Sequence, residues 1–240
     1  MSLPTPYYDD GHGIVIYLGD CRDILPHLPK VDLVLTDPPY ELEAHTLQRR
    51  VKREGGVMEM EPLAFEPMNE ALRLCVSGQL AKLAQRWVLT FCQIEAAPTW
   101  RKTYEGWGLV YKRTCIWVKP DGMPQYSGDR PGMGYETFVA MHAEGKSRWN
   151  GGGRHGVWIV NKNDNGGFKN EHPTTKPSQL IDDLVGLFSD LGDTILDPFM
   201  GSGTTLRAAK DLGRQCIGIE IEEKYCEIAV RRLAQTVLPL

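Results

Sequence analysis

Short apolar runs rich in β-branched residues alternate along this chain with segments whose apolar residues recur at helical spacing. The apolar runs end at Gly, Pro or Asp, which favours buried strands over helices. The predicted strands span residues 13–19, 31–36, 87–94, 109–118, 137–142, 157–160, 194–197 and 215–220. The predicted helices span residues 21–30, 64–86, 178–190, 204–212 and 222–235. This alternation predicts an α/β fold with a mostly parallel sheet covered by helices on both faces.

Polar segments between these elements carry most of the positive charge. Residues 41–61 predict a mobile loop, and residues 121–171 include two irregular stretches rich in Gly, Pro and Arg. Residues 41–170 contain 18 Lys and Arg against 14 Asp and Glu, whereas the rest of the chain contains 9 against 17. The net charge of −4 does not by itself indicate a nucleic-acid partner. The basic middle of the chain is where such a partner would bind.

Composition narrows the class of protein. With 240 residues, 42% of them apolar, residues 1–240 predict a single folded domain. No apolar run approaches the roughly 18 residues that span a membrane, and the first residues do not resemble a secretory leader. The six cysteines contain no C-x-x-C pair and lie mostly in apolar runs. We therefore expect buried free thiols in a cytoplasmic protein and no metal site.

The loop at residues 197–204, Asp-Pro-Phe-Met-Gly-Ser-Gly-Thr, joins a predicted strand to a predicted helix. Gly201 and Gly203 allow close approach of a ligand to the backbone, and the helix start offers free N–H groups. Glu220 ends the next strand, where a carboxylate can accept hydrogen bonds from both ribose hydroxyls. The pattern predicts a nucleoside-cofactor site. It is not a dinucleotide fingerprint, because Leu206 stands where that motif has a third Gly.

The tetrapeptide Asp37-Pro38-Pro39-Tyr40 ends another predicted strand, at the edge where open α/β sheets bind ligands. An exocyclic amino group is a poor nucleophile because its lone pair is delocalised into the base. The Asp37 carboxylate and the Pro38 carbonyl can each accept a hydrogen bond from that amine and stabilise the positive charge that develops on it. Tyr40 offers a face on which a flipped base can stack.

Together these motifs resemble the amino-type DNA methyltransferases, which modify adenine N6 or cytosine N4. The order resembles their permuted β group, in which D-P-P-Y precedes the F-x-G-x-G cofactor loop. The resemblance rests on YLGDCRDIL at 17–25, VDLVLTDPPY at 31–40, RTCIWVKP at 113–120, HPTTKP at 172–177, TILDPFMGSGTT at 194–205 and CIGIEIEEKY at 216–225. It implies a circularly permuted, Rossmann-like methyltransferase fold that uses S-adenosylmethionine to methylate an adenine flipped out of DNA.

The resemblance also implies roles for individual residues. Asp20 and Cys21 would face the adenine of the cofactor, and Glu220 would bind its ribose. The residues that would hold the rest of the cofactor are Asp197, Phe199, Gly201, Ser202, Gly203 and Thr204 in the loop, and His172, Thr174, Lys176 and Pro177 over the methionine end, where Lys176 would face a carboxylate. The permutation makes strands 194–197, 215–220, 14–19 and 32–36 the first to fourth of the standard fold. The two chain ends should therefore pair side by side.

DNA contacts are expected from basic residues in the two polar segments. Arg49, Arg50, Lys52 and Arg53 follow the tetrapeptide and suit phosphate contacts. Arg130, Arg148 and Arg154 lie on Gly-rich backbone near aromatic residues, which suits groove contact. Trp149, in the same stretch, can equally belong to the core.

Several other functions are weighed against this interpretation. Cytosine N4 methylation uses the same amine chemistry and stays open, although Asp at position 37 resembles the adenine enzymes more. Cytosine C5 methylation needs a Pro-Cys loop, and the chain has no Pro-Cys dipeptide. Protein and RNA methyltransferases usually carry the Pro-Pro motif after the cofactor loop. A non-catalytic subunit would lack the intact motifs, and a nicotinamide oxidoreductase would not need D-P-P-Y. A bacterial or phage origin is expected, while a homodimer and a cognate restriction nuclease stay open.

Overall fold

The computed structural model describes most of the chain. The described residues are 3–39, 51–53, 56–58, 68–122, 124–125, 128–162 and 175–235, with the backbone alone described at 51–53 and 56–58. Seven predicted site residues lie outside these ranges or have no described side chain there: Tyr40, Arg49, Arg50, Lys52, Arg53, His172 and Thr174.

Nine strands of the described chain form one sheet, in the order β1-β2-β11-β10-β3-β6-β8-β7-β9. Their bounds in that order are Tyr8–Asp9, Ile14–Leu18, Gln215–Glu220, Thr194–Asp197, Val31–Thr36, Ala84–Cys92, Tyr135–His142, Val110–Val118 and Val157–Ile159. Strands β1 and β8 run antiparallel to their neighbours, and every other pairing is parallel. The predicted mostly parallel sheet is confirmed.

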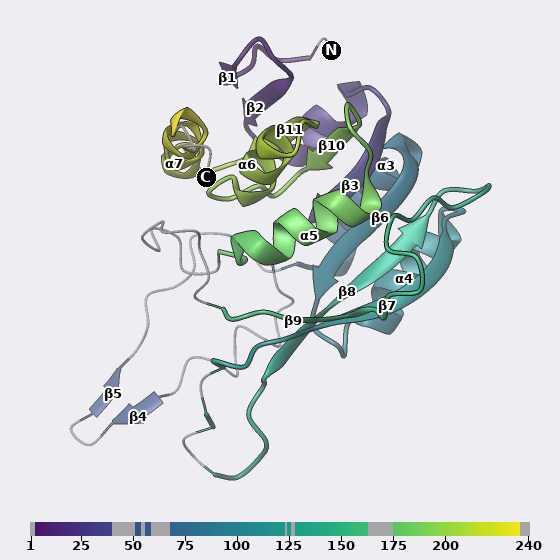
Figure 1. The fold of residues 1–240 in the computed structure, drawn as a ribbon. Helices are drawn as coiled ribbons and strands as arrows, with labels where there is room; N and C mark the ends of the chain where they lie inside the picture. The colour runs from purple at the N-terminus through teal and green to yellow at the C-terminus, as the bar shows by residue number, and fades with distance from the viewer. Residues whose placement is uncertain are drawn as a thin grey trace.

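Helices cover both faces of this sheet (Figure 1). One face packs against α1 (Cys21–Ile24), the 3-10 turn η1 (Leu25–His27), α3 (Glu70–Leu83) and α4 (Ala97–Gly106). The other packs against α5 (Ser178–Phe188), α6 (Thr204–Asp211) and α7 (Glu223–Ala234). Two hydrophobic clusters, one on each side, form the core.

The two halves of the chain meet in the sheet as the permutation predicts. The C-terminal strand β11 pairs in parallel with β2, from Cys216 opposite Ile14 to Glu220 opposite Leu18. Strand β10 lies between β11 and β3. The cofactor loop after β10 and the tetrapeptide after β3 therefore emerge from neighbouring strands at the same edge.

The boundary between α3 and β6 differs from the prediction. The helix is confined to Glu70–Leu83, and β6 begins at Ala84. Residues 84–86 have good helix propensity, but Ala84 pairs with Val31 of the neighbouring strand. Long-range pairing in the sheet outweighs local propensity here.

Four short elements of the described chain were not expected. Helix α4 buries Ala97, Trp100 and Tyr104, and this helical spacing after Gln93 was the available signal. Strand β1 pairs antiparallel with β2. The expectation of a loop throughout 41–61 is wrong at β4 (Val51–Arg53) and β5 (Gly56–Met58), which form an antiparallel hairpin.

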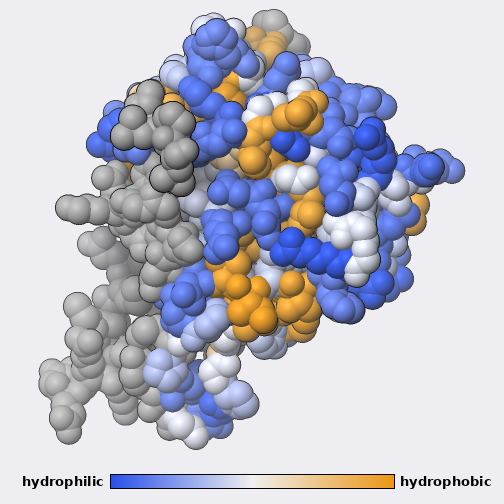
Figure 2. All heavy atoms as spheres, viewed as in Figure 1, coloured by the Kyte–Doolittle hydropathy of each residue, from blue (hydrophilic) through white to orange (hydrophobic). Residues whose placement is uncertain are grey.

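The outer surface follows the amphipathic pattern of the helices. Figure 2 shows hydrophilic residues over most of the face that carries α5, α6 and α7, with apolar residues in small groups between them. No helix among the described residues is long and apolar enough to cross a membrane.

Candidate active site

A cavity of about 720 Å³ opens at the carboxyl-terminal edge of the parallel strands. This volume lies within the roughly 300–1,000 Å³ typical of cofactor and ligand pockets. Its walls come from the segments after β2, β3, β10 and β11, from the start of α3 and from the residues before α5. Predicted residues that line it are Asp20, Cys21, Asp37, Pro38, Pro39, Lys176, Asp197, Phe199, Gly201, Ser202, Thr204 and Glu220.

The glycine turn forms one wall because only glycine fits there. Gly201 and Gly203 have φ angles of +51° and +78°, in the left-handed region. A Cβ on Gly203 would come within 2.7 Å of the Ala229 Cβ on α7. Gly203 does not itself line the cavity, but it lets the chain turn directly into α6.

Glu220 presents its carboxylate beside this turn. Its Oε2 accepts a hydrogen bond from Gly201 N at 3.0 Å, and its Oε1 accepts one from Glu222 N at 2.9 Å. Burial raises the pKa of Glu220, while these N–H groups oppose the rise. Each carboxylate oxygen keeps a further lone pair, so the group can still accept hydrogen bonds from a diol in the cavity.

One end of the cavity is formed by α1 and α3. It lies beside Glu220, whose backbone O accepts a hydrogen bond from Gly19 N at 2.9 Å. Asp20 caps α1 by accepting from Arg22 N at 2.8 Å, and it also pairs with the Arg22 guanidinium, which lowers the pKa of Asp20. Cys21 is buried beside it. Four residues at the start of α3 also line this end and were not predicted: Asn69, Ala71, Leu72 and Cys75.

Asp37 follows β3, the strand next to β10, and lines the cavity together with Pro38 and Pro39. Its Oδ2 accepts a hydrogen bond from the Lys176 ammonium. Its Oδ1 is buried and has no hydrogen-bond partner among the described residues. Burial raises the pKa of Asp37, and Lys176 opposes that rise.

Lys176, which the sequence suggested would face a cofactor carboxylate, lines the cavity and pairs there with carboxylates of the protein. Its ammonium pairs with Asp37 and lies 3.3 Å from Glu136 Oε2. It also lies 5.0 Å from the centre of the Phe91 ring. Pro177 follows Lys176 at the start of α5 and is not among the lining residues.

Glu136 and Lys119 were not singled out from the sequence. Lys119 pairs with Glu136. Lys119 directly follows β7, and Glu136 is the second residue of β8. Burial raises the pKa of Glu136, but Lys176 and Lys119 outweigh it and lower the pKa to about 2. A charged residue at the head of the apolar run TFVAMH was the one available signal.

Asp197 lies at the base of the glycine turn, almost completely buried. Its Oδ1 accepts a hydrogen bond from Phe199 N at 3.2 Å. Burial raises the pKa of Asp197 to about 7. This carboxyl group shapes the turn rather than presenting a charge to the cavity.

The three described arginines expected to contact DNA lie apart from the cavity lining. Arg130 is exposed in the connection between β7 and β8, which leaves the sheet at the cavity edge, and pairs with Asp129. Arg154 pairs with Asp183 on α5 at 2.8 Å and lies over the Trp158 ring. Trp149 packs against Phe188, with ring centres 4.9 Å apart, so it belongs to the core.

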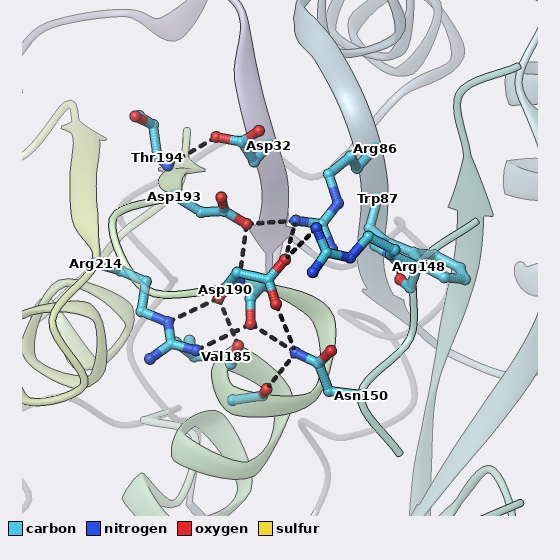
Figure 3. A network of polar contacts seen from close by, with 12 residues as sticks. Asp32, Arg86, Trp87, Arg148, Asn150, Val185, Asp190, Asp193, Thr194 and Arg214 are labelled. Atoms are coloured by element: carbon cyan, nitrogen blue, oxygen red, sulfur yellow. Dashed lines mark hydrogen bonds and ion pairs between the residues drawn. The ribbon is translucent and has the colours of Figure 1, made fainter. Parts of the chain in front are cut away.

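Arg148 belongs to a polar network at the opposite edge of the sheet (Figure 3). Asp190 pairs there with Arg86 at 3.1 Å and with Arg148 at 3.3 Å. Asn150 donates to Ser189 O at 2.9 Å. The network attaches the segment after β8 to the end of α5, and Arg148 lies there, at the edge of the sheet opposite the cavity; its contact with DNA stays a prediction.

Comparisons with known proteins agree with this geometry. Residues 31–231 match the family model N6_N4_Mtase, described as DNA methylase. The chain belongs to this family of amino-type DNA methyltransferases.

Two curated relatives are type II methyltransferases. M.XycI of Xanthomonas campestris pv. cyanopsidis is 34% identical over 56% of this chain and 48% of its own length. M.HinfI of Haemophilus influenzae is 28% identical over 92% of this chain and 68% of its own length. The chain thus spans about half the length of the first and about two thirds of the second.

Solved structures show the same fold. The M1.HpyAVI complex with S-adenosylmethionine superposes with a TM-score of 0.71 at 26% identity, covering 92% of this chain and 98% of that one. The cytosine-N4-specific PvuII DNA methyltransferase gives a TM-score of 0.70 at 14% identity, covering 99% of this chain and 90% of that one. The Rossmann-like methyltransferase fold is confirmed, and S-adenosylmethionine is confirmed as the cofactor at the level of the family.

Proposed function

We propose that this chain transfers a methyl group from S-adenosylmethionine to the exocyclic N6 of an adenine flipped out of DNA. The observation that carries the proposal is that Asp37 and the Gly201–Glu220 pair line one cavity. An amine held by Asp37 would therefore lie in the same enclosed space as a cofactor held by the glycine turn.

The described residues fit the cofactor. When bound, S-adenosylmethionine supplies an electrophilic methyl group on a sulfonium. The Glu220 carboxylate would accept hydrogen bonds from the ribose hydroxyls, and the open backbone at Gly201 and Ser202 lets the ligand approach closely. Asp20 and Cys21, with Leu72 of α3, would surround the adenine ring. Phe199, Thr204 and Asp197 would shape the turn, and His172, Thr174 and Pro177 would adjoin the methionine end.

Asp37 and the Pro38 carbonyl would orient the target amine. Two acceptors on one NH2 group favour the tetrahedral nitrogen that attacks the methyl group, and they stabilise the positive charge that forms there. The buried Asp37 Oδ1, which lacks a hydrogen-bond partner among the described residues, is available for this bond. Pro39 stiffens the wall, and Tyr40 would stack on the flipped base.

Adenine is favoured over cytosine by the residue at the head of the tetrapeptide. An Asp at position 37 resembles the adenine enzymes, whereas the cytosine N4 enzymes often carry Ser there. Cytosine N4 is the second candidate, because its amine needs the same two acceptors and the PvuII enzyme shares this fold. The type II relatives support methylation at a specific DNA site, and they support a cognate restriction nuclease as a partner.

The test is to express the chain and its Asp37→Ala variant in cells that lack adenine and N4-cytosine methylation. We expect N6-methyladenine at one sequence motif with the wild type, and a loss of at least about 1,000-fold with Asp37→Ala, because an acceptor for developing charge is removed. Nucleoside mass spectrometry identifies the base, and modified-base sequencing identifies the motif. N4-methylcytosine would move the proposal to its second candidate, and unmodified DNA would reject it.

The control separates catalysis from folding. Asp23→Ala removes an exposed carboxylate on α1 and should leave methylation unchanged. Asp37→Ala should still gain thermal stability on addition of S-adenosylmethionine, because the glycine turn and Glu220 are intact. Full methylation by Asp37→Ala would remove Asp37 from the mechanism.

A further inference from the structure

Four charged side chains meet beside the Asp37 carboxylate. They are brought together by the ends of elements far apart in the sequence: Asp37 after β3, Lys119 after β7, Glu136 at the start of β8 and Lys176 before α5. The contacts form a chain in which Asp37 pairs with Lys176, Lys176 with Glu136 and Glu136 with Lys119. We call these four residues the charge chain.

Burial makes the charge chain more than a surface ion-pair cluster. The exposed fractions of the side chains are 7% for Lys176, 13% for Lys119, 15% for Glu136 and 24% for Asp37. Aromatic rings complete its walls, with Lys119 Nζ 4.7 Å from the centre of the Trp117 ring. Ions removed from water are stable only when they are paired, and the charge chain balances two carboxylates against two ammonium groups.

Asp37 alone would be a poor acceptor in this place. Burial favours its protonated form. A protonated carboxyl group is neutral and one of its oxygens carries the proton, so it stabilises a developing positive charge less than a carboxylate does. Lys176 opposes protonation by donating to Oδ2. The cation itself, however, is almost entirely buried, and a buried lysine readily loses its proton unless it is paired.

Glu136 supplies the second pairing that Lys176 needs. Glu136 lies on strand β8, next to β6. Its Oε2 lies 3.3 Å from the Lys176 ammonium, and its Oε1 pairs with Lys119. Neither Glu136 nor Lys119 lines the cavity. Glu136 therefore reaches the site through its contact with Lys176 and through its own charge. That charge raises the pKa of Asp37, but the effect is smaller than the lowering by the Lys176 ammonium.

We propose that Glu136 is a positioning residue for methyl transfer: it keeps the Lys176 ammonium charged and directed at Asp37 Oδ2, so that Asp37 stays ionised with Oδ1 left to accept the target amine. The role in methyl transfer rests on the function proposed above. The proposed effect of Glu136 on the charge of Lys176 does not depend on that function.

The first experiment measures the single-turnover rate of methyl transfer with labelled S-adenosylmethionine at saturating cofactor and DNA. Glu136→Gln should lower this rate by about 10- to 100-fold, the effect of losing one contact between largely buried charged groups. The affinity for S-adenosylmethionine should change by less than about twofold, because the loss arises in the transition state. A wild-type rate, or a rate that falls only as far as cofactor binding falls, would overturn the proposal.

Two further variants make the result specific. Glu105→Gln removes an exposed carboxylate on α4 that pairs with Arg101, and it should keep the wild-type rate. Glu136→Asp keeps the charge but is too short to hold both lysines, so its rate should lie between those of wild type and Glu136→Gln. If Glu136→Gln does not fold, the rate of Glu136→Asp tests the proposal by itself, and a wild-type rate for Glu136→Asp would overturn it.

The second experiment needs neither cofactor nor DNA. Titration of the Lys176 ammonium by NMR on protein labelled with ¹⁵N-lysine, assigned with Lys176→Met, should show a lower pKa in Glu136→Gln than in wild type, by about one unit or more. An unchanged pKa would overturn the proposed link between Glu136 and Lys176. Unmethylated DNA with the wild type, by contrast, would reject only the proposed function.

Discussion

Three largely buried carboxyl groups at the cavity edge of the sheet have three different environments. Asp37 shares a lysine with Glu136, Glu136 is held by two lysines, and Asp197 accepts its hydrogen bonds from uncharged groups of the described chain. Burial acts on all three, and the number of nearby ammonium groups decides the direction of each pKa. Residues of one chemical type are thereby suited to different tasks, with Asp37 and Asp197 lining the cavity and Glu136 behind its wall.

Asp197 should make stability depend on pH. Its pKa is about 7 in the folded protein against an ordinary 3.8, so the folded state binds the proton more tightly than the unfolded state. Its contribution to stability is fully present below about pH 4 and is lost as pH rises through 7. The free energy of unfolding of Asp197→Asn, relative to that of wild type, should therefore rise by roughly 3 kcal/mol from pH 5 to pH 8, at about 1.36 kcal/mol per pKa unit.

Urea unfolding of both proteins without cofactor at the two pH values measures this difference. Asn keeps an oxygen that can accept from Phe199 N, so the turn should stay intact. Asp23→Asn, at an exposed position on α1, is the control and should show no such pH-dependent gain. A constant difference between Asp197→Asn and wild type across this range would contradict a protonated Asp197.

At the scale of elements, the cofactor turn depends on contacts that its own sequence does not contain. The chain leaves β10, turns through two left-handed glycines and enters α6 directly against α7. Gly218 of β11 adds a second close approach, since a Cβ there would lie 2.5 Å from Met200 Sδ. The turn is therefore fitted between β11 and α7 as well as between its own strand and helix.

Gly203→Ala should lower the free energy of unfolding by roughly 2–5 kcal/mol. The left-handed backbone costs about 1–2 kcal/mol for a residue with a Cβ, and crowding against Ala229 adds about 1–3 kcal/mol. Gly152→Ala is the matched control, because Gly152 has a φ of +55° but a Cβ added there would meet no described atom within 4 Å. It should cost only the backbone term of about 1–2 kcal/mol. Denaturant unfolding measures both, and equal losses would show that packing against α7 is unimportant.

At the scale of the whole molecule, basic residues lie at both edges of the sheet. The β4–β5 hairpin, which carries Lys52 and Arg53, and the connection between β7 and β8 project from the same side in Figure 1. Arg148 belongs to the polar network at the opposite edge, and Arg154 pairs with α5. DNA that reaches the cavity would therefore meet the hairpin before it meets these two arginines.

Lys52→Ala with Arg53→Ala should weaken DNA binding and make its salt dependence shallower. Each phosphate contact that is lost reduces the slope of log K against log salt by about 0.9. Arg148→Ala with Arg154→Ala removes the same charge and should leave the slope unchanged. Fluorescence anisotropy at several salt concentrations measures both pairs. Equal effects of the two pairs would mean that overall charge, rather than the hairpin, attracts the DNA.

The sequence by itself determined the α/β alternation, the permuted order of strands and the two loops that line the cavity. Those signals are local, because buried parallel strands are short apolar runs and a tight turn requires glycine at particular positions. Strands 31–36, 194–197 and 215–220 were predicted with the bounds that the structure has. The parallel pairing of the two chain ends followed from their order.

Only the tertiary structure decided where α3 gives way to β6, that Arg148 pairs with Asp190 at the far edge of the sheet, and that Lys176 pairs with protein carboxylates. Each depends on contacts between residues far apart in the sequence, such as Ala84 with Val31 and Lys176 with Asp37. The roles of Glu136 and Lys119 could not be predicted for the same reason. Charged residues are mostly exposed, so burial and pairing are not expected from the sequence. Local patterns report backbone conformation, whereas the protonation and direction of a buried charge are set by its neighbours in space.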